Sequence, residues 1–414
     1  MNTIKKTLGF FSVMTLLSIP NTWAATFTVN SSADVVDVHP GDGVCAAVKA
    51  GCTLRAAVME ANARSGPDTI QLPTGTYFLT RSQSLSTPYD FMDHINDADN
   101  DLDITDNLTI TGTAKKGQTA NPVIMPSKTF TGRAFQIKEN VAVTMKNLVI
   151  KGFSLGEGEA TRGGAILNLG VLHLRRLTLS GNNAGQGGAV FSGKYDGYNG
   201  GESNNAGISV VNCGIFDNSA VVMGGGIYSS EDGWALISNT TIADNNTAEN
   251  GPQASAGGGI YNRSNMTITH STISGNNADN GGGIFFAPGV PPSSQLNIKS
   301  TLLANNTATE NTTSDYSGAD MTSLGYNLIG VVNQELGVPL SASNAGPDLL
   351  DVDPVLGAFV DEALPGRTYF PLSAESPAID AADPTICTGG ALAFDQRGQA
   401  RVGTCDIGAY EYAP

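Results

Sequence analysis

The stretch from Gly257 to Phe286 reads GGGIYNRSNMTITHSTISGNNADNGGGIFF. It contains one repeat unit and the start of the next. Each unit has glycines with an aliphatic residue, then polar residues, an alternation of apolar residues and asparagine. Five such openings, 24 to 37 residues apart, begin at Gly163, Gly187, Gly224, Gly257 and Gly281. A repeat of this length without helical periodicity is typical of a solenoid, whose units bury their apolar faces only by stacking on one another.

The repeat predicts an all-β chain folded as a right-handed parallel β-helix, in which each short strand pairs with its copy in the next coil. Parallel strands lie about 4.8 Å apart, and parallel connections are right-handed in nearly all proteins. We expect one solenoid over residues 68–330, with its C-terminal end and cap in residues 331–414. Insertions at 192–206 and 249–256 predict side loops.

One stretch departs from the strand pattern and predicts a short helix. From Thr53 to Arg64, apolar residues recur at helical spacing, with Thr53 as the N-cap and Gly66-Pro67 as the stop. We expect this capping helix, within an N-terminal cap of residues 25–67, to cover the open end of the solenoid, because an uncovered strand edge promotes aggregation.

Alignment of the repeats predicts columns of similar side chains along the solenoid. An asparagine column contains Asn182, Asn218, Asn245, Asn276 and Asn305, and a polar column at a predicted corner contains Arg176, Asn212, Asn239, His270 and Lys299. The last turn is aligned with a one-residue gap. Because a side-chain amide both donates and accepts, we expect the stacked asparagines to bond to one another as a ladder.

The first 24 residues have the pattern of a secretory signal peptide, with two lysines, an apolar run from Leu8 to Ile19 and a final Ala24. We therefore expect an exported protein, secreted, at the cell surface or in the periplasm, whose mature chain starts near Ala25. No later segment approaches the ~20 apolar residues of a membrane helix. The net charge of −16 argues against nucleic acid or anionic membrane as partners. We expect a monomer.

Five cysteines in an exported chain predict two disulfides and one free thiol. Closeness along the chain favours pairing Cys45 with Cys52 and Cys387 with Cys405. Cys213 lies inside a predicted strand. A buried, inert thiol is the favoured interpretation there, and a reactive thiol is the alternative.

Both ends of the chain carry further motifs. The N-terminal ones include Cys52-Thr53-Leu54-Arg55-Ala56-Ala57 and Leu72-Pro73-Thr74-Gly75, and the C-terminal ones include Ser376-Pro377-Ala378-Ile379-Asp380 and Cys405-Asp406-Ile407-Gly408-Ala409-Tyr410-Glu411. These motifs resemble bacterial exported β-helix proteins of the CSLREA type, also described by a choice-of-anchor C-terminal domain, although Ala56 replaces the glutamate of the name-giving motif. The glycine phrases also look like passengers of polymorphic outer-membrane proteins. The resemblance implies a pectate-lyase-like β-helix and an exported location, and it brings no settled reaction.

Carboxylates alternate through Asp97, Asp99, Asp101 and Asp103. Oxygen ligands at this density could hold calcium, which is the one cofactor that the sequence suggests. The spacing does not fit an EF-hand, because glycine and glutamate are missing where that loop requires them. The favoured alternative is an exposed strand edge that the carboxylates keep soluble.

Two groups of charged residues are candidates for chemistry on a polysaccharide. Arg176, His270 and Lys299 could supply the cationic base of a lyase, but the favoured interpretation is a corner column that faces solvent. A C-terminal group could supply acid–base chemistry or, as we favour, structural ion pairs: Asp395, Arg397, Arg401, Asp406 and Glu411. Several aromatic residues are placed where sugars could stack or where they could fill the core: Tyr195, Tyr198, Trp234, Tyr261, Phe285 and Phe286.

Two hypotheses about function follow. The favoured one is a non-catalytic exported β-helix that presents an extended surface for glycan or cell-surface binding and adhesion. The alternative is a polysaccharide lyase or glycoside hydrolase on the same fold, since fold alone does not decide function. The columns favour a scaffold, because they do not bring an acid, a base and a metal to one point.

Overall fold

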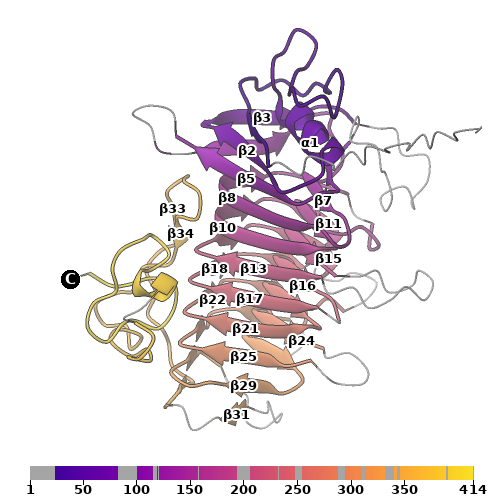
Figure 1. The fold of residues 1–414 in the computed structure, drawn as a ribbon. Helices are drawn as coiled ribbons and strands as arrows, with labels where there is room; N and C mark the ends of the chain where they lie inside the picture. Colours follow the sequence, from indigo (N-terminus) through magenta and orange to yellow (C-terminus); the bar gives the residue numbers. More distant parts are fainter. Residues whose placement is uncertain are drawn as a thin grey trace, which may run out of the picture.

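The computed structural model describes residues 24–82, 100–114, 119, 121–156, 158–193, 206–231, 233–247, 254–287, 294–309, 314–331, 340–342, 346–387 and 390–413. The described strands stack into a tall parallel solenoid, with helix α1 (Leu54–Ala63) at one end and the C-terminal segment along one side (Figure 1). This confirms the predicted parallel β-helix. The predicted signal peptide falls almost wholly outside the described residues.

Three parallel sheets form the walls of the solenoid. The largest, of 19 described strands, contains β1 (Thr26–Thr28), β2 (Asp68–Pro73), β3 (Gly75–Leu79), β5 (Leu108–Thr113), β6 (Pro122–Pro126), β8 (Ala142–Lys151), β10 (Val171–Ser180), β13 (Gly207–Val211), β14 (Gly214–Phe216), β17 (Trp234–Ser238), β18 (Thr241–Ala243), β21 (Asn265–Thr269), β22 (Thr272–Ser274), β25 (Leu296–Lys299), β26 (Leu302–Leu303), β29 (Met321–Ser323), β30 (Leu328–Ile329), β31 (Leu340–Ala342) and β32 (Leu349–Leu350).

The two smaller walls complete each coil. One contains β4 (Leu102–Ile104), β7 (Phe135–Ile137), β9 (Ile166–Asn168), β12 (Val190–Ser192), β16 (Ile227–Ser229), β20 (Ile260–Asn262), β24 (Ile284–Phe286) and β28 (Tyr316–Gly318). The other contains β11 (Asn183–Gln186), β15 (Ser219–Met223), β19 (Asn246–Thr247), β23 (Asn277–Ala278) and β27 (Thr307–Ala308). Outside the walls, β33 (Val360–Asp361) and β34 (Thr368–Tyr369) form an antiparallel pair, and a 3-10 helix spans Gly390–Ala393.

Register between coils places like residues on top of one another. The predicted apolar column is in register from Leu174 through Val210, Ile237 and Ile268 to Ile298. All five side chains are buried. The interior is therefore a continuous apolar stack that no single coil could form alone.

The alignment of the last repeat was wrong. Thr269 pairs with Lys299, so the corner position after it holds Ser300 and not Lys299. The backbone N–H of Asn276 donates to the side chain of Asn306, which replaces the predicted Asn305 in the ladder. The two coils match at a constant offset, and the one-residue gap does not exist.

The asparagine ladder itself is confirmed. From Asn182 to Asn306, each side-chain amide donates to the oxygen of the next, over 2.8 to 2.9 Å. The last amide donates to Asp315 over 2.8 Å, so a carboxylate ends the column. Every member is buried. The ladder therefore gives hydrogen-bond partners to polar groups that would otherwise lack them in the core.

The N-terminal cap follows the prediction. The hydroxyl of Thr53 accepts a hydrogen bond from the backbone N–H of Ala56 over 3.0 Å, which makes Thr53 the N-cap of α1. Arg55 is fully buried and pairs with Asp34 over 2.6 Å. The helix lies at the end of the solenoid marked by β2 and β3 (Figure 1).

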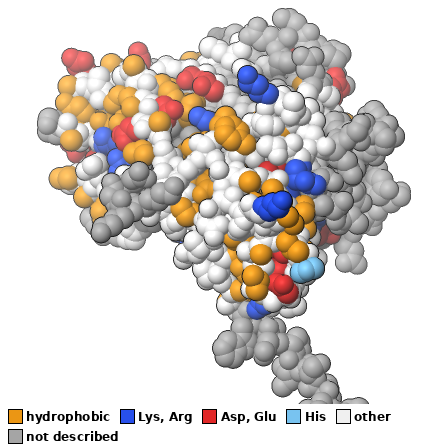
Figure 2. Space-filling view, turned by 90° about the horizontal axis from the view of Figure 1, so that it is seen from above, with side chains coloured by type: hydrophobic (Ala, Val, Ile, Leu, Met, Phe, Trp, Pro, Cys, Tyr) orange, Lys and Arg blue, Asp and Glu red, His pale blue; other side chains and the backbone are white. Residues whose placement is uncertain are grey.

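The C-terminal segment, residues 351–413, turns back along the side of the solenoid (Figure 1). Thr178 donates to the backbone oxygen of Leu364, and Thr241 donates to the side chain of Gln396. Seen along the solenoid, the segment projects as a lobe with hydrophobic and charged side chains on its surface (Figure 2). It thus docks on several coils, whereas we expected it to close the C-terminal end.

Both predicted disulfides are confirmed, Cys45–Cys52 and Cys387–Cys405. Cys213 is free and buried, as the favoured interpretation required. The described part of the chain contains no helix with the length and apolar character of a membrane span.

Candidate functional site

The corner of the largest sheet is built by left-handed residues. Asn147, Arg176, Asn212, Asn239, His270 and Ser300 have φ between 45° and 57°. Asparagine adopts this conformation readily, whereas other side chains do so at some cost. Each left-handed residue turns the chain, so that the apolar alternation resumes beyond the corner within the same sheet and the corner side chain stays outside the apolar stack.

The C-terminal segment covers one half of this corner column. The amide of Asn239 donates to the backbone oxygen of Phe394 over 2.6 Å and accepts from Arg401 over 2.9 Å. His270 lies against the disulfide, with 3.8 Å between its Nε2 and the Sγ of Cys405. The hydroxyl of Ser300 accepts from the backbone N–H of Asp383 over 3.1 Å.

The other half of the column opens into a cleft of about 500 Å³. The solenoid contributes one wall and a loop of the C-terminal segment contributes the other: Lys146, Asn147, Arg175, Arg176, Val211 and Asn212, facing Phe394 and Gly398. We call this the cationic cleft. Lys146 on β8 and Arg175 on β10 are register partners, so their strands are about 4.8 Å apart.

The cleft is lined by positive charges that form no ion pair with the described residues. Within the described part of the chain, no ion pair involves Lys146, Arg175 or Arg176. Arg175 and Arg176 are exposed, in a protein whose net charge is −16. Burial, and then the charge of Arg175, hold the pKa of His173 below its usual value.

Two further groups line the cleft. The side-chain oxygen of Asn212 is buried and has no hydrogen-bond partner among the described residues. Phe394 is a large apolar residue with 49% of its surface exposed. The cleft therefore combines cations, an amide and an aromatic side chain, which is the mixture of polar and apolar groups that small-ligand sites show.

The lyase candidates do not converge. Arg176 lines the cationic cleft, but His270 is fully buried three coils away, and its pKa is lowered to about 3 by burial and then by the charge of Arg401. Lys299 is paired with Asp383 over 2.6 Å. A base for proton abstraction must reach substrate, and in this structure only Arg176 is exposed.

The aspartate group is described only in part. Asp97 and Asp99 lie outside the described residues. Asp101 and Asp103 are buried, at 3.5 Å from Arg133 and 3.1 Å from Lys138, respectively. These two carboxylates are therefore not on an exposed strand edge, and calcium binding by the group stays a prediction.

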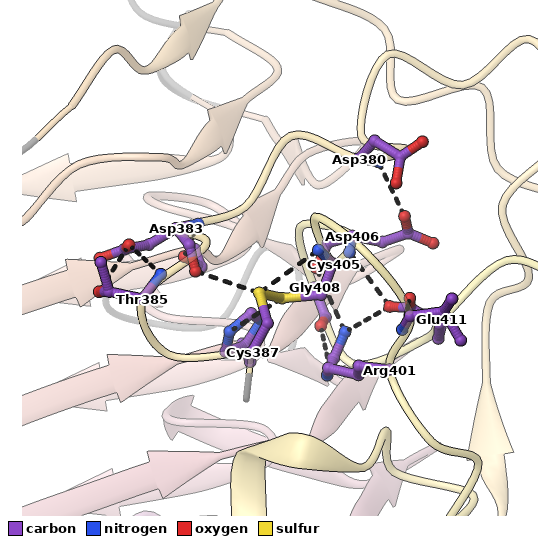
Figure 3. Close-up of a disulfide and its surroundings, with 12 residues drawn as sticks. Asp380, Asp383, Thr385, Cys387, Arg401, Cys405, Asp406, Gly408 and Glu411 are labelled. Atoms are coloured by element: carbon purple, nitrogen blue, oxygen red, sulfur yellow. Dashed lines mark hydrogen bonds and ion pairs between the residues drawn. A yellow bond between two sulfur atoms is a disulfide. The ribbon is translucent and has the colours of Figure 1, made fainter. Parts of the chain in front are cut away.

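The C-terminal charged group surrounds the second disulfide (Figure 3). Arg401 pairs with Glu411 over 3.1 Å and donates to the backbone oxygens of Asp406 and Gly408. Burial raises the pKa of Asp406 to about 6. Arg397 pairs with Asp395 over 2.7 Å. These contacts join successive turns of the segment, which is the geometry that the structural interpretation requires.

Two of the aromatic candidates, Tyr261 and Phe285, stack on each other within a longer aromatic column. Phe191, Tyr228, Tyr261 and Phe285 stack on successive coils, with ring centroids 4.6 to 5.4 Å apart. Because their faces meet, this column stabilises the wall and offers few free ring faces. Phe286 is buried, Trp234 lies 6.4 Å from His173, and Tyr195 and Tyr198 lie outside the described residues.

Sequence reasoning missed Lys146, Asn147 and Phe394. The first two precede the earliest glycine phrase, so the alignment of the repeats did not include them. The contribution of Phe394 depends on a chain reversal for which the sequence has no local signal. The strand-to-corner pattern of Arg175-Arg176 recurs at Lys146-Asn147 and could have extended the column by one coil.

No family model matches the chain, and no match is found among curated proteins or solved structures. The resemblance to CSLREA-type proteins thus stays a prediction.

Proposed function

We propose that this protein is an exported, non-catalytic β-helix that binds an acidic glycan in the cationic cleft. The observation that carries the proposal is the set of three cations, Lys146, Arg175 and Arg176, with no ion pair among the described residues. Elsewhere in the described chain, several buried or half-buried cations have a carboxylate partner, as Lys299 does.

The chemistry of these groups fits carboxylate or sulfate groups on a sugar chain. A guanidinium presents a planar fork of donors that matches a carboxylate, and Arg175 and Arg176 offer two of them side by side. The excess negative charge of the chain repels a polyanion at long range, so the local cations must supply the attraction at close range. Binding should therefore be weakened by salt.

The test is calorimetric titration with oligogalacturonate, a sulfated glycosaminoglycan fragment and a neutral oligosaccharide. The double variant Arg175→Ala, Arg176→Ala should lose at least about tenfold in affinity for the acidic ligands, since exposed charge contacts contribute about 1 kcal/mol each. The control is Lys151→Ala, which removes an exposed cation of the neighbouring strand β8 outside the cleft. Equal binding by both variants would refute the proposal.

The same mixtures test the enzyme alternative. After incubation with calcium and with chelator, the size of each polymer is measured. Intact polymers that remain bound are the expected result. Shortened polymers would instead assign a lyase or hydrolase to this fold, and Arg176 would then be the first residue to replace, because it is the lyase candidate that lines the cleft.

A further inference from the structure

Ala25, the first residue of the expected mature chain, contacts the buried carboxylate of Asp68. The backbone nitrogen of Ala25 donates to Oδ1 of Asp68 over 2.6 Å, and Asp68 is only 2% exposed. The backbone oxygen of Ala25 accepts from Thr69 over 2.8 Å, and β1 then pairs with β2 from Thr26 onward. The position of Ala25 is thus set by strand pairing, independently of what precedes it.

Asp68 is poorly compensated by its surroundings. Its Oδ2 is buried and has no hydrogen-bond partner within the described residues. Two charged groups face it: Arg64 at the end of α1, and Asp106, whose carboxylate accepts from the backbone N–H of Gly66 over 3.0 Å. Burial raises the pKa of Asp68, while the Ala25 N–H and Arg64 lower it. A buried carboxylate usually has an ionic partner or several donors.

We propose that removal of the first 24 residues creates an α-ammonium group on Ala25 that pairs with Asp68, so that signal cleavage stabilises the N-terminal cap. Hydrolysis of the Ala24–Ala25 peptide bond consumes one water and leaves a carboxylate on Ala24 and an amine on Ala25, which takes up a proton below its pKa. One neutral N–H donor is thereby replaced by a cation with three donors, 2.6 Å from Oδ1 and close to the unpartnered Oδ2.

The consequence is a protein that is less stable before processing than after it. While the leader is attached, the Ala25 nitrogen is an amide, and the charge of Asp68 is offset by this neutral N–H donor and then by Arg64. After cleavage the cap, which covers the end of the solenoid, gains a buried ion pair. This inference does not depend on the proposed glycan binding.

The experiment compares purified proteins that begin at Ala25 and at Ala24, each with wild-type Asp68 and with Asp68→Asn. At pH 6, the form beginning at Ala25 should have a folding equilibrium constant at least about tenfold higher, because one pKa unit of interaction corresponds to a factor of ten. In the Asp68→Asn pair the difference should vanish. Acetylation of the Ala25 amine, which needs no variant at Asp68, should remove the gain.

The dependence on pH identifies the group. An α-amine has a pKa of about 7.7 to 8.0 in unfolded chains, and pairing raises it in the folded protein. Within the pH range in which Asp68 is ionised, the gain should therefore be complete below about pH 7.7 and disappear as pH rises through the raised value. Equal stability of the two starting points, a gain that survives Asp68→Asn, or an exported protein whose first residue by mass spectrometry is not Ala25 would each overturn the inference.

Discussion

At the scale of single residues, the role of a side chain is decided by its counterparts one coil above and below. Cys213 illustrates this. The thiol of Cys213 accepts a hydrogen bond from the backbone N–H of Leu177 over 3.4 Å. The backbone N–H of Cys213 donates to the hydroxyl of Thr240 over 3.3 Å. The backbone N–H of Thr240 in turn donates to the hydroxyl of Ser271. Burial raises the pKa of Cys213 to about 12, so the thiol is a ladder member and a poor nucleophile.

Asn245→Ala should strongly destabilise the solenoid. Asn245 accepts from the backbone and side chain of Asn218 and donates to Asn276, all within the core. Its removal leaves buried groups without partners, at a cost of about 3 kcal/mol. The measurement is urea unfolding, with the exposed neighbour substitution Asn246→Ala as control. A loss below that of the control would show that the ladder contributes little.

The end of the ladder should make stability depend on pH. Burial raises the pKa of Asp315 to about 6 despite the bonds it accepts from Asn306 and Val331. A carboxyl group with a raised pKa contributes stability that is complete below its unfolded pKa near 4 and is lost as pH rises through 6. Asp315→Asn should flatten this decline, measured as urea midpoints from pH 4 to 7. The exposed Asp320→Asn should leave it unchanged.

Phe394 should contribute to sugar binding and not to the binding of anions in general. Phe394→Ala is expected to lower the affinity for oligogalacturonate about fivefold, because an aromatic contact contributes about 1 kcal/mol. Affinity for inorganic polyphosphate, which has no apolar ring face, should stay unchanged. The control is Val402→Ala, at a more exposed apolar residue of the same loop. An equal loss for both ligands would contradict stacking.

At the scale of elements, the C-terminal segment builds the second wall of the cleft. The Cys387–Cys405 disulfide encloses the loop that carries Phe394 and Gly398, and it lies against His270 two corner positions from the cleft. Between His270 and the cleft, the side chain of Asn239 forms hydrogen bonds with Phe394 and Arg401 of this loop. The loop therefore reaches the cleft from a fixed base.

Cys387→Ser with Cys405→Ser should weaken acidic-glycan binding while the solenoid persists. Removing the disulfide opens a loop of 18 residues and costs about 3 kcal/mol of stabilisation. The C-terminal segment, which contains this loop, is the part that becomes less stable. We expect faster proteolysis at Arg397, weaker binding by titration and unchanged far-ultraviolet circular dichroism. Replacement of Cys45 and Cys52 by serine is the control and should affect the cap without affecting binding. Full affinity in the first variant would show that the loop holds its position unaided.

At the scale of the whole molecule, the fold is one-dimensional. Each coil contacts only its neighbours, so stability is close to a sum over coils and their interfaces. The C-terminal segment breaks this rule, because its hydrogen bonds reach coils from Asn121 to Ser300 and fix the number of coils between these anchors.

Deletion of residues 257–280, one whole coil from β20 to β23, should leave a shorter solenoid with a detached C-terminal segment. The columns rejoin, since β24 to β27 repeat the pattern of the deleted strands. The anchors on the segment no longer match, because the His270 coil is gone. We expect retained β-sheet signal, cooperative unfolding and rapid tryptic cleavage at Arg397 and Arg401. A segment that stays resistant would mean that its docking tolerates a shift of one coil.

The repeat determined the parallel β-helix and its interior columns, whereas helical spacing after Thr53 determined the cap helix and closeness along the chain determined both disulfide pairs. These features depend on spacing along the chain and on contacts between neighbouring coils. Both produce patterns that can be recognised in the sequence. The cationic cleft and the Ala25–Asp68 contact were decided by tertiary structure. Phe394 reaches Arg176 only because the C-terminal segment reverses along the solenoid, and Ala25 reaches Asp68 only through the pairing of β1 with β2. Such contacts join residues far apart in the chain, where no periodic signal records them.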